Sequence, residues 1–154
     1  MNRVEVDRYF PHPVDRVFWR YTDHVGWSDW AGLGPVRVIR EGSPDRNGVG
    51  SVRAFAVAPG LREEVVRFEP PGQGGNRGAR TDYRVLRGPI PLDDHLGEVI
   101  FTPEGSGTRV TWRVTFRSRI PGLGWPIEKG LGVLFPRMLA ALGRDLDRRA
   151  RRDG

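Results

Sequence analysis

The sequence predicts one α+β domain in which an antiparallel sheet packs against a long C-terminal helix. Three observations support this fold class. Apolar and charged residues alternate at the N-terminus, short alternating segments separated by Gly and Pro turns follow from residue 36 to residue 119, and apolar residues then recur every three or four positions. Because the sheet and the helix each have an apolar face to cover, we expect the helix to lie across the sheet.

The N-terminal part of the chain predicts a strand followed by two short helices. Residues 2–10 alternate between apolar and charged side chains, as a half-buried strand requires. Pro13 suits the first turn of a helix, and apolar residues at helical spacing follow it. Residues 24–30 predict a second short helix or tight connection, which carries Trp27 and Trp30 three positions apart.

The middle of the chain predicts an antiparallel meander whose segments are separated by turn residues such as Pro59-Gly60. The last segment places alternate residues from Val110 to Phe116 on one apolar face. Residues 72–75 are glycine-rich, but they precede a strand rather than a helix and so lack the context of a phosphate-binding loop. We expect strands over residues 36–40, 49–57, 61–69, 80–87, 95–102 and 108–119.

The C-terminal part predicts a long amphipathic helix. Apolar residues recur at helical spacing from Ile127 to Leu146, with charged residues on the opposite face. Pro126 suits the first turn, whereas Pro136 is expected to kink the helix or split it in two. The segment is too polar and too interrupted for a membrane span.

Composition restricts the function classes. The chain has 154 residues, enough to bury a core, and a formal net charge of +6; of its 25 Lys and Arg residues only Lys129 is a lysine. The absence of cysteine excludes disulfides, a thiolate nucleophile and a cysteine-based zinc site, and it fits a reducing compartment. The N-terminus lacks the apolar segment of a signal peptide, so we expect a cytoplasmic protein.

Five segments of the chain carry a family resemblance, namely residues 10–18, 27–30, 48–53, 63–65 and 107–112. In this order, together with the order of the elements, they resemble the helix-grip domains of the START-like (SRPBCC) superfamily, in particular the polyketide cyclase/dehydrase and lipid transport branch. The resemblance covers nearly the whole chain. It implies a curved antiparallel sheet of about seven strands wrapped around the long helix, with two short helices after the first strand and a cavity between sheet and helix.

This resemblance does not imply a reaction, because members of the superfamily include polyketide cyclases, lipid and hormone binders, chaperone co-factors and toxins. It does suggest candidate catalytic residues. Related domains often turn an arginine toward the cavity at the position of Arg53, and Glu64 lies on the next strand, close enough to pair with it. Such a pair would anchor a ligand oxygen or stabilise an enolate, or it would be a structural ion pair at the rim. His95 would act as an acid or base if it faces the cavity, and is otherwise a solvated loop residue.

Aromatic and apolar residues are the candidate ligand contacts. Tyr83 and Trp112 fall on the predicted inner face of the sheet, and Trp27 and Trp30 lie near the predicted entrance. Rings with a polar atom suit a flat, partly oxygenated ligand, although inward aromatic residues are often plain core. Together with Arg53, the expected ligand-binding residues are Trp27, Trp30, Tyr83, Trp112, Phe116, Leu131 and Met138.

Other partners have less support. The three histidines form no His-x-His or i,i+4 pair, so we expect no metal and no other cofactor. His12 is expected in a surface turn and His24 at a helix junction. The basic run over residues 144–152 is diluted by aspartates and suits a solvated helix end, so we expect no nucleic-acid partner.

The sequence therefore predicts a domain that binds a hydrophobic or aromatic small molecule in an internal cavity, similar to a polyketide cyclase/dehydrase. Two alternatives stay open: a non-catalytic carrier of a lipid or isoprenoid, and a protein-interaction module without a ligand. The sequence does not choose between a monomer and a homodimer.

Overall fold

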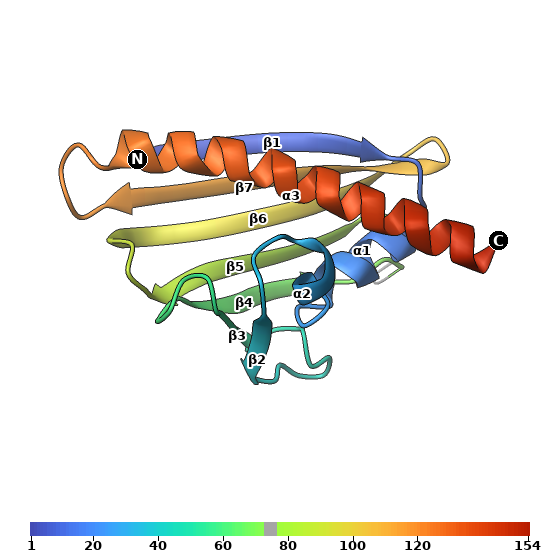
Figure 1. Cartoon of the computed structure of the whole chain (residues 1–154), viewed down its shortest axis with the longest axis horizontal. Helices are drawn as coiled ribbons and strands as arrows, with labels where there is room; N and C mark the ends of the chain where they lie inside the picture. The colour runs from blue at the N-terminus through green and yellow to red at the C-terminus, as the bar shows by residue number, and fades with distance from the viewer. Residues whose placement is uncertain (73–76) are drawn as a thin grey trace.

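The computed structural model describes residues 1–72 and 77–154, so part of the glycine-rich stretch 72–75 lies outside the described residues. The described residues form one sheet and three helices (Figure 1). In chain order the elements are β1 (Asn2–Phe10), α1 (Val14–Thr22), α2 (Trp27–Trp30), β2 (Val36–Arg40), β3 (Val52–Phe55), β4 (Arg62–Glu69), β5 (Ala79–Arg87), β6 (Leu92–Glu104), β7 (Gly107–Ser118) and α3 (Gly124–Asp153).

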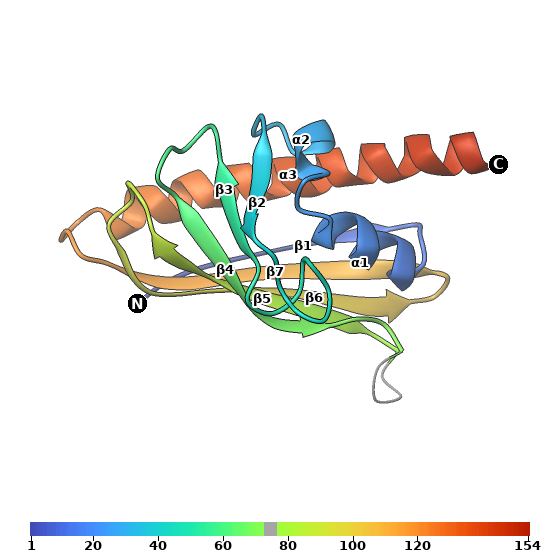
Figure 2. The same cartoon turned by 90° about the horizontal axis from the view of Figure 1, so that it is seen from below.

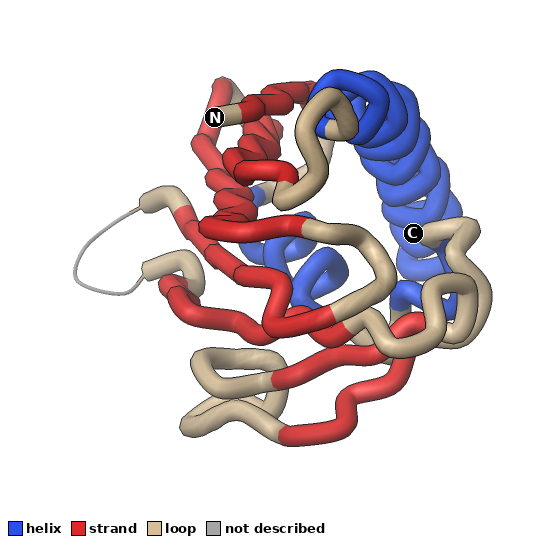
Figure 3. The backbone as a smooth tube through the Cα atoms, turned by 90° about the vertical axis from the view of Figure 1, so that its left-hand side faces the viewer, coloured by secondary structure: helices blue, strands red, loops and turns tan. Residues whose placement is uncertain are grey.

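The sheet has seven strands in the order β1-β7-β6-β5-β4-β3-β2, and all neighbours are antiparallel. It curves around one side of α3, and α1 and α2 lie on the same side, toward the C-terminal half of α3 (Figures 1 and 2). Seen from one end, the strands form a bent wall with the helices on its inner side (Figure 3). The predicted helix-grip fold is confirmed.

Side chains alternate along β7 between the buried inner face of the sheet and its outer face. Val110, Trp112, Val114 and Phe116 are all buried, at 2% exposure or less, and belong to the apolar core between sheet and helices. Residues between them face the other side of the sheet, where charged groups from neighbouring strands meet. The inner and outer faces of the sheet are therefore distinct in chemistry.

Arginine side chains on the outer face are held mainly by carboxylates on adjacent strands. Arg113 Nε donates to Glu5 Oε1 at 2.7 Å, and Arg109 Nη1 donates to Asp7 Oδ1 at 2.7 Å. Arg80 pairs with Glu98 on the adjacent strand β6 and with Asp82 on its own strand. Cross-strand pairs of opposite charge stabilise a sheet modestly, and here they neutralise much of the positive charge that the composition shows.

The structure corrects three predictions about elements. β3 spans only Val52–Phe55, because residues 48–50 form a turn in which Gly50 has a φ of +91°. β6 begins earlier than expected, at Leu92. Pro136 does not split α3, which is one helix of 30 residues. Proline has no backbone N–H, so the carbonyl of Gly132 receives no hydrogen bond from Pro136. Both residues are exposed, and water can therefore bind this carbonyl.

Polar contacts fix both ends of α3. At its start, Glu128 accepts hydrogen bonds from Asn2 Nδ2 at 3.0 Å and from the Arg3 backbone N–H at 3.1 Å. In its second half, Asp145 pairs with Arg20 of α1 at 2.7 Å, and both side chains are less than a tenth exposed. None of the helices among the described residues is long and apolar enough to cross a bilayer.

The segment between β1 and α1 also contacts α3. His12 Nε2 lies 2.7 Å from Asp147 Oδ1, and the His12 carbonyl accepts a hydrogen bond from Thr108 Oγ1. The prediction of a surface turn at His12 is wrong, because the histidine is buried between α3 and the start of β7.

Replacing Asp145 by Asn should lower the free energy of unfolding by about 2 kcal/mol, because it removes the shortest carboxylate contact of the buried Arg20 guanidinium and leaves it only Asp23 and Asp29, at 3.5 and 3.6 Å. Although burial acts the other way, the hydrogen bond from Arg20 holds the pKa of Asp145 below 3.8. The stabilisation is therefore present above pH 3.8 and is lost as the pH falls through the lower folded-state pKa. Urea unfolding at neutral and acidic pH measures both effects, with Asp153→Asn, exposed at the end of α3, as the control.

Candidate functional site

A cavity of about 210 Å³ lies between α3 and the inner face of the sheet. Val57 and Ile90, on the loops after β3 and β5, are exposed members of its lining and mark the side on which it meets solvent. The lining is mostly apolar and aromatic, and consists of Trp27, Leu33, Phe55, Val57, Ala58, Leu61, Glu63, Tyr83, Val85, Ile90, Leu92, His95, Trp112, Ile127, Leu131, Leu134, Phe135 and Met138.

A buried ion pair lies beside this cavity. Arg53 on β3 and Glu63 on β4 are directly opposite in the sheet, and Glu63 Oε1 accepts a hydrogen bond from Arg53 Nε at 2.9 Å. Arg53 is 2% exposed and its guanidinium lies against the rings of Trp27 and Tyr83, at 4.6 and 4.7 Å from their centroids. Burial alone would lower the pKa of Arg53, but the Glu63 carboxylate, together with Tyr21 and Tyr83, outweighs it and raises the pKa. Arg53 is therefore a permanent cation behind the cavity wall.

The predicted pairing of Arg53 with Glu64 is wrong. Glu64 lies on the outer face of the sheet, where Arg84 Nη2 is 2.7 Å from it and Arg40 also binds it. Glu63 points inward instead and lines the cavity. Both Arg53 contacts reach the same Glu63 oxygen, so that Oε2 makes no hydrogen bond to the described part of the chain. Oε2 is available to accept a hydrogen bond.

Tyr83 and Trp112 form one side of the cavity, as predicted for the inner face. The Tyr83 hydroxyl accepts a hydrogen bond from Trp112 Nε1 at 2.9 Å. The Tyr83 ring reaches across β6 because its register partner there is Gly97; a Cβ at that position would overlap the ring. Burial, and then the charge of Glu63, raise the pKa of Tyr83 well above 10, so that its hydroxyl remains protonated.

His95 lines the cavity from β6, which corrects the alternative of a solvated loop residue. The paired register of β5 and β6 stops at Tyr83 and Gly97, and beyond it the Val85 backbone N–H donates to His95 Nδ1 at 3.1 Å. Burial lowers the pKa of His95, and the charge of Glu63 acts in the opposite direction. A neutral ring that accepts at Nδ1 carries its proton on Nε2, and so has a hydrogen-bond donor left for a ligand.

Trp27 connects the cavity to a group of buried polar atoms behind it. Its ring packs against Tyr21 and His24, with centroids 5.3 and 5.8 Å apart. The Tyr21 hydroxyl and both ring nitrogens of His24 have no hydrogen-bond partner among the described residues. Burial, and then the charge of Arg53, hold the pKa of His24 well below 6.5, so that His24 is neutral. Ordered water can supply the missing hydrogen bonds of these atoms.

The other predicted ligand contacts divide into two groups. Leu131 and Met138 line the cavity from α3. Trp30 and Phe116 are buried in the core without reaching the cavity, and Trp30 packs on Trp27 at 5.8 Å. Sequence reasoning missed Phe135, which stacks on Trp112 with centroids 4.0 Å apart, although its place in the apolar helical repeat was a signal for it.

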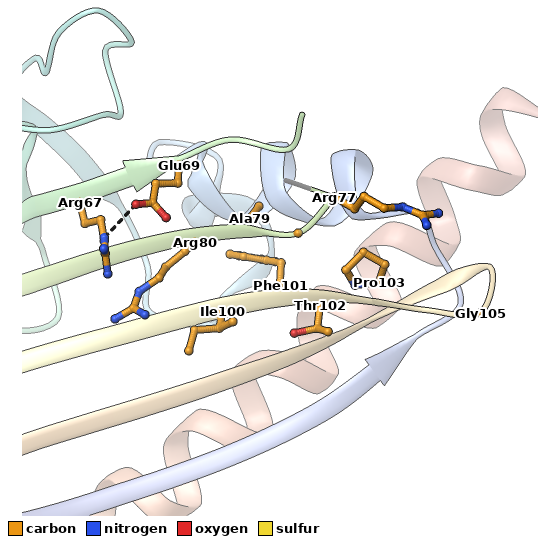
Figure 4. Close-up of a pocket in the computed structure, with 11 residues that line it drawn as sticks. Arg67, Glu69, Arg77, Ala79, Arg80, Ile100, Phe101, Thr102, Pro103 and Gly105 are labelled. Carbon is orange, nitrogen blue, oxygen red and sulfur yellow. Dashed lines mark ion pairs between the residues drawn. The ribbon is translucent and has the colours of Figure 1, made fainter. Parts of the chain in front are cut away.

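A larger and more open hollow of about 660 Å³ lies where β4 ends, β5 begins and β6 ends (Figure 4). Its charged groups are largely neutralised, since Arg67 pairs with Glu69 at 2.9 Å and Arg80 pairs with Asp82 at 3.0 Å. It is separate from the internal cavity and contains none of the predicted site residues. Among the described residues, no three His, Asp or Glu side chains are grouped so as to hold a metal ion.

Comparison with known proteins relates this arrangement to a family. A family model described as polyketide cyclase/dehydrase and lipid transport matches residues 1–151. A solved structure from Thermus thermophilus is 25% identical, with a TM-score of 0.66 and 99% of each chain covered. A START superfamily protein from Mycobacterium smegmatis is 11% identical, with a TM-score of 0.67 over 96% of this chain and 99% of that chain.

DynU16, from the dynemicin biosynthetic locus, is 19% identical, with a TM-score of 0.62 over 96% of this chain and 48% of that chain. A search of curated proteins found no match. The structural likenesses agree with the helix-grip fold described above.

Replacing Gly97 by Ala should lower the free energy of unfolding by about 1–3 kcal/mol, because the added methyl group overlaps the Tyr83 ring and must displace it from Trp112. Urea unfolding and near-ultraviolet circular dichroism measure the loss of stability and the change around the rings. The matched control is Gly130→Ala in α3, where nothing lies within 4 Å and a gain of about 0.5–1 kcal/mol is expected. A neutral Gly97→Ala would show that the ring is not held in this position.

Proposed function

The chain belongs to the polyketide cyclase/dehydrase and lipid transport family, and we propose that its cavity binds a neutral aromatic molecule of about two fused rings that carries a hydroxyl group. The observation that carries this proposal is an apolar internal cavity whose lining includes one carboxylate, that of Glu63, and one neutral histidine, His95. Ligand sites typically combine an apolar lining with a few polar groups that set orientation and specificity.

Cavity size favours a bicyclic ligand. An engineered apolar cavity of about 150 Å³ is known to bind benzene, so a cavity of about 210 Å³ suits a somewhat larger ring system. The flat rings of Trp112 and Phe135 form part of the lining and suit a planar ligand. These features favour an aromatic ligand over the alternative of a long lipid chain, and an empty interior argues against a module that binds no ligand.

The polar groups favour a ligand that donates a hydrogen bond. Glu63 Oε2 is an unused acceptor, while the positive charge of Arg53 is already compensated and lies behind the rings. A hydroxyl group of the ligand would donate to Glu63 and accept from His95 Nε2. A carboxylate in the same place would be repelled by Glu63.

The protein should bind β-naphthol and bind β-naphthoate at least about tenfold more weakly, because a second carboxylate beside Glu63 is unfavourable. Replacing Leu131 by Trp should weaken β-naphthol binding by at least about tenfold, since the indole occupies the cavity. Quenching of tryptophan fluorescence or isothermal titration calorimetry measures each affinity.

The control for this experiment is Val133→Trp, because Val133 lies on the same helix but is 54% exposed and outside the cavity. The control should retain wild-type affinity. Equal affinity in Leu131→Trp and wild type would place the bound naphthol outside the cavity and reject the proposal.

A second candidate function is enolisation of a cyclic ketone, favoured by the approach of Glu63 and His95 to the same cavity. The Glu63 carboxylate would take a proton from the carbon next to the carbonyl. The C–H electron pair would then form the enolate double bond, and His95 Nε2–H would hydrogen-bond the enolate oxygen. Returning the proton reverses the step, so that no further reagent is consumed.

If this step occurs, the protein should accelerate deuterium exchange into β-tetralone in D2O by about a hundredfold, a typical contribution of general-base catalysis. The double variant Arg53→Met with Glu63→Gln should lose the acceleration without leaving an unpaired buried charge. Proton NMR follows the exchange. If the wild-type protein binds β-naphthol but exchanges β-tetralone no faster than buffer does, the protein is a binder rather than an enolising enzyme.

A further inference from the structure

One row of residues on the outer face differs from the rest of that face in its charge. Across four neighbouring strands, Arg37 of β2 is opposite Ala54 of β3, Ala54 is opposite Arg62 of β4, and Arg62 is opposite Arg87 of β5. We call Arg37, Arg62 and Arg87 the arginine row. The row lies where β2 and β4 begin and β3 and β5 end, beside the loops that form the cavity opening. It is on the opposite face of the sheet from the cavity.

The arginine row is not neutralised by the protein. None of its three guanidinium groups forms an ion pair with a carboxylate in residues 1–72 or 77–154, whereas Arg84 and Arg113 on the same face do. Glu64, the carboxylate of the next row, is already bound by Arg40 and Arg84. Like charges directly opposite one another, as in Arg62 and Arg87, destabilise a sheet.

Arg62 is the central member of the row and is held in place by the backbone. Its Nη1 donates to the Leu61 carbonyl at 2.9 Å, which orients the guanidinium. Its Nε is buried and has no hydrogen-bond partner among the described residues. The protein therefore satisfies the guanidinium group of Arg62 only in part.

Two surface hollows meet at Arg62. One, of about 260 Å³, lies over the small side chain of Ala54 between Arg37 and Arg62. The other, of about 300 Å³, is lined by Arg62 and Arg87 together with the exposed side chain of Leu86. The row therefore offers recesses of small-molecule size, lined by unneutralised guanidinium groups.

We propose that the arginine row binds a phosphate monoester. A doubly charged phosphate would compensate Arg62 and Arg87 together, and the planar guanidinium fork matches two phosphate oxygens. The monoester could belong to a soluble metabolite or to a lipid headgroup. The exposed Val57 and Ile90 at the nearby cavity opening would face a lipid surface in the second case. This site is independent of ligand binding in the cavity.

The proposal is tested with two probes that carry the same chemical group, namely glycerol phosphate in solution and phosphatidylcholine vesicles with added phosphatidic acid. Calorimetry measures the first, and vesicle co-sedimentation against phosphatidylcholine alone measures the second. Arg62→Gln and Arg87→Gln should each weaken binding by about tenfold, as expected for one charge-assisted contact. Arg87 is exposed and donates no hydrogen bond to the described residues, so its variant tests the site without disturbing the fold.

The matched control is Arg144→Gln, which removes one exposed, unpaired arginine of α3 and the same unit of charge. It should change either affinity by less than about twofold. Binding of one probe alone supports the site and identifies its source of phosphate. The proposal is overturned if neither probe binds the wild-type protein, or if the control weakens binding as much as the row variants do.

Discussion

The burial of one cation, the guanidinium of Arg53, constrains much of the interior. A charge at 2% exposure is costly unless a carboxylate and favourable contacts compensate it, and Glu63 is directly opposite in the sheet. The faces of the guanidinium lie against Trp27 and Tyr83, and the Tyr83 hydroxyl in turn holds the Trp112 indole. The cation therefore sets the positions of three rings that line the cavity. Gly97 is required for this arrangement because the Tyr83 ring passes over it.

The cavity persists because α3 is fixed to the sheet and to α1 at positions outside it. Glu128 binds the first residues of β1, and Asp145 binds Arg20 in α1. Between these contacts Leu131, Phe135 and Met138 face the sheet and fill the interior only in part. On the other side, the register of β5 and β6 ends at Tyr83 and Gly97, where the His95 ring replaces a backbone acceptor. The cavity and the polar side chain of His95 thus occur at the same place in the fold.

On both faces of the sheet, several arginines are compensated by a carboxylate that lies directly opposite them on the next strand. Arg113 lies opposite Glu5 and Glu98, and Arg53 lies opposite Glu63. Arg62 faces Ala54 on one side and Arg87 on the other, so neither register partner offers it a carboxylate. The chain is rich in arginine, but only the arrangement of the strands distinguishes a neutralised arginine from one that is available to a partner.

Much of the fold could be predicted because its signals are local. Alternation in residues 2–10 predicted β1, and turn residues bounded β2 at the residues observed. The candidate site was predicted less well, and Glu63 shows why. Phe68 packs inward on Phe18 and strict alternation from it would turn Glu64 inward, but a bulge between Val65 and Arg67 shifts the pattern by one residue. A bulge has no clear sequence signature here, because Val65 and Val66 are equally apolar.

The sequence by itself therefore determined the order of the elements, the apolar face of β7, the long C-terminal helix and the choice of Arg53, Tyr83, Trp112 and His95 as residues of interest. The elements and the inward face that carries Tyr83 and Trp112 follow from periodicity and turn chemistry, which act over a few neighbouring positions. The choice of Arg53 follows from the resemblance to helix-grip domains, and that of His95 from the ability of a histidine to act as an acid or a base. Only the tertiary structure decided that Glu63 rather than Glu64 meets Arg53, that His12 is buried, and that Arg62 has no carboxylate. Each of these depends on strand register or on packing between distant segments, and residues far apart in the sequence carry no local record of which of them will be opposite in the sheet.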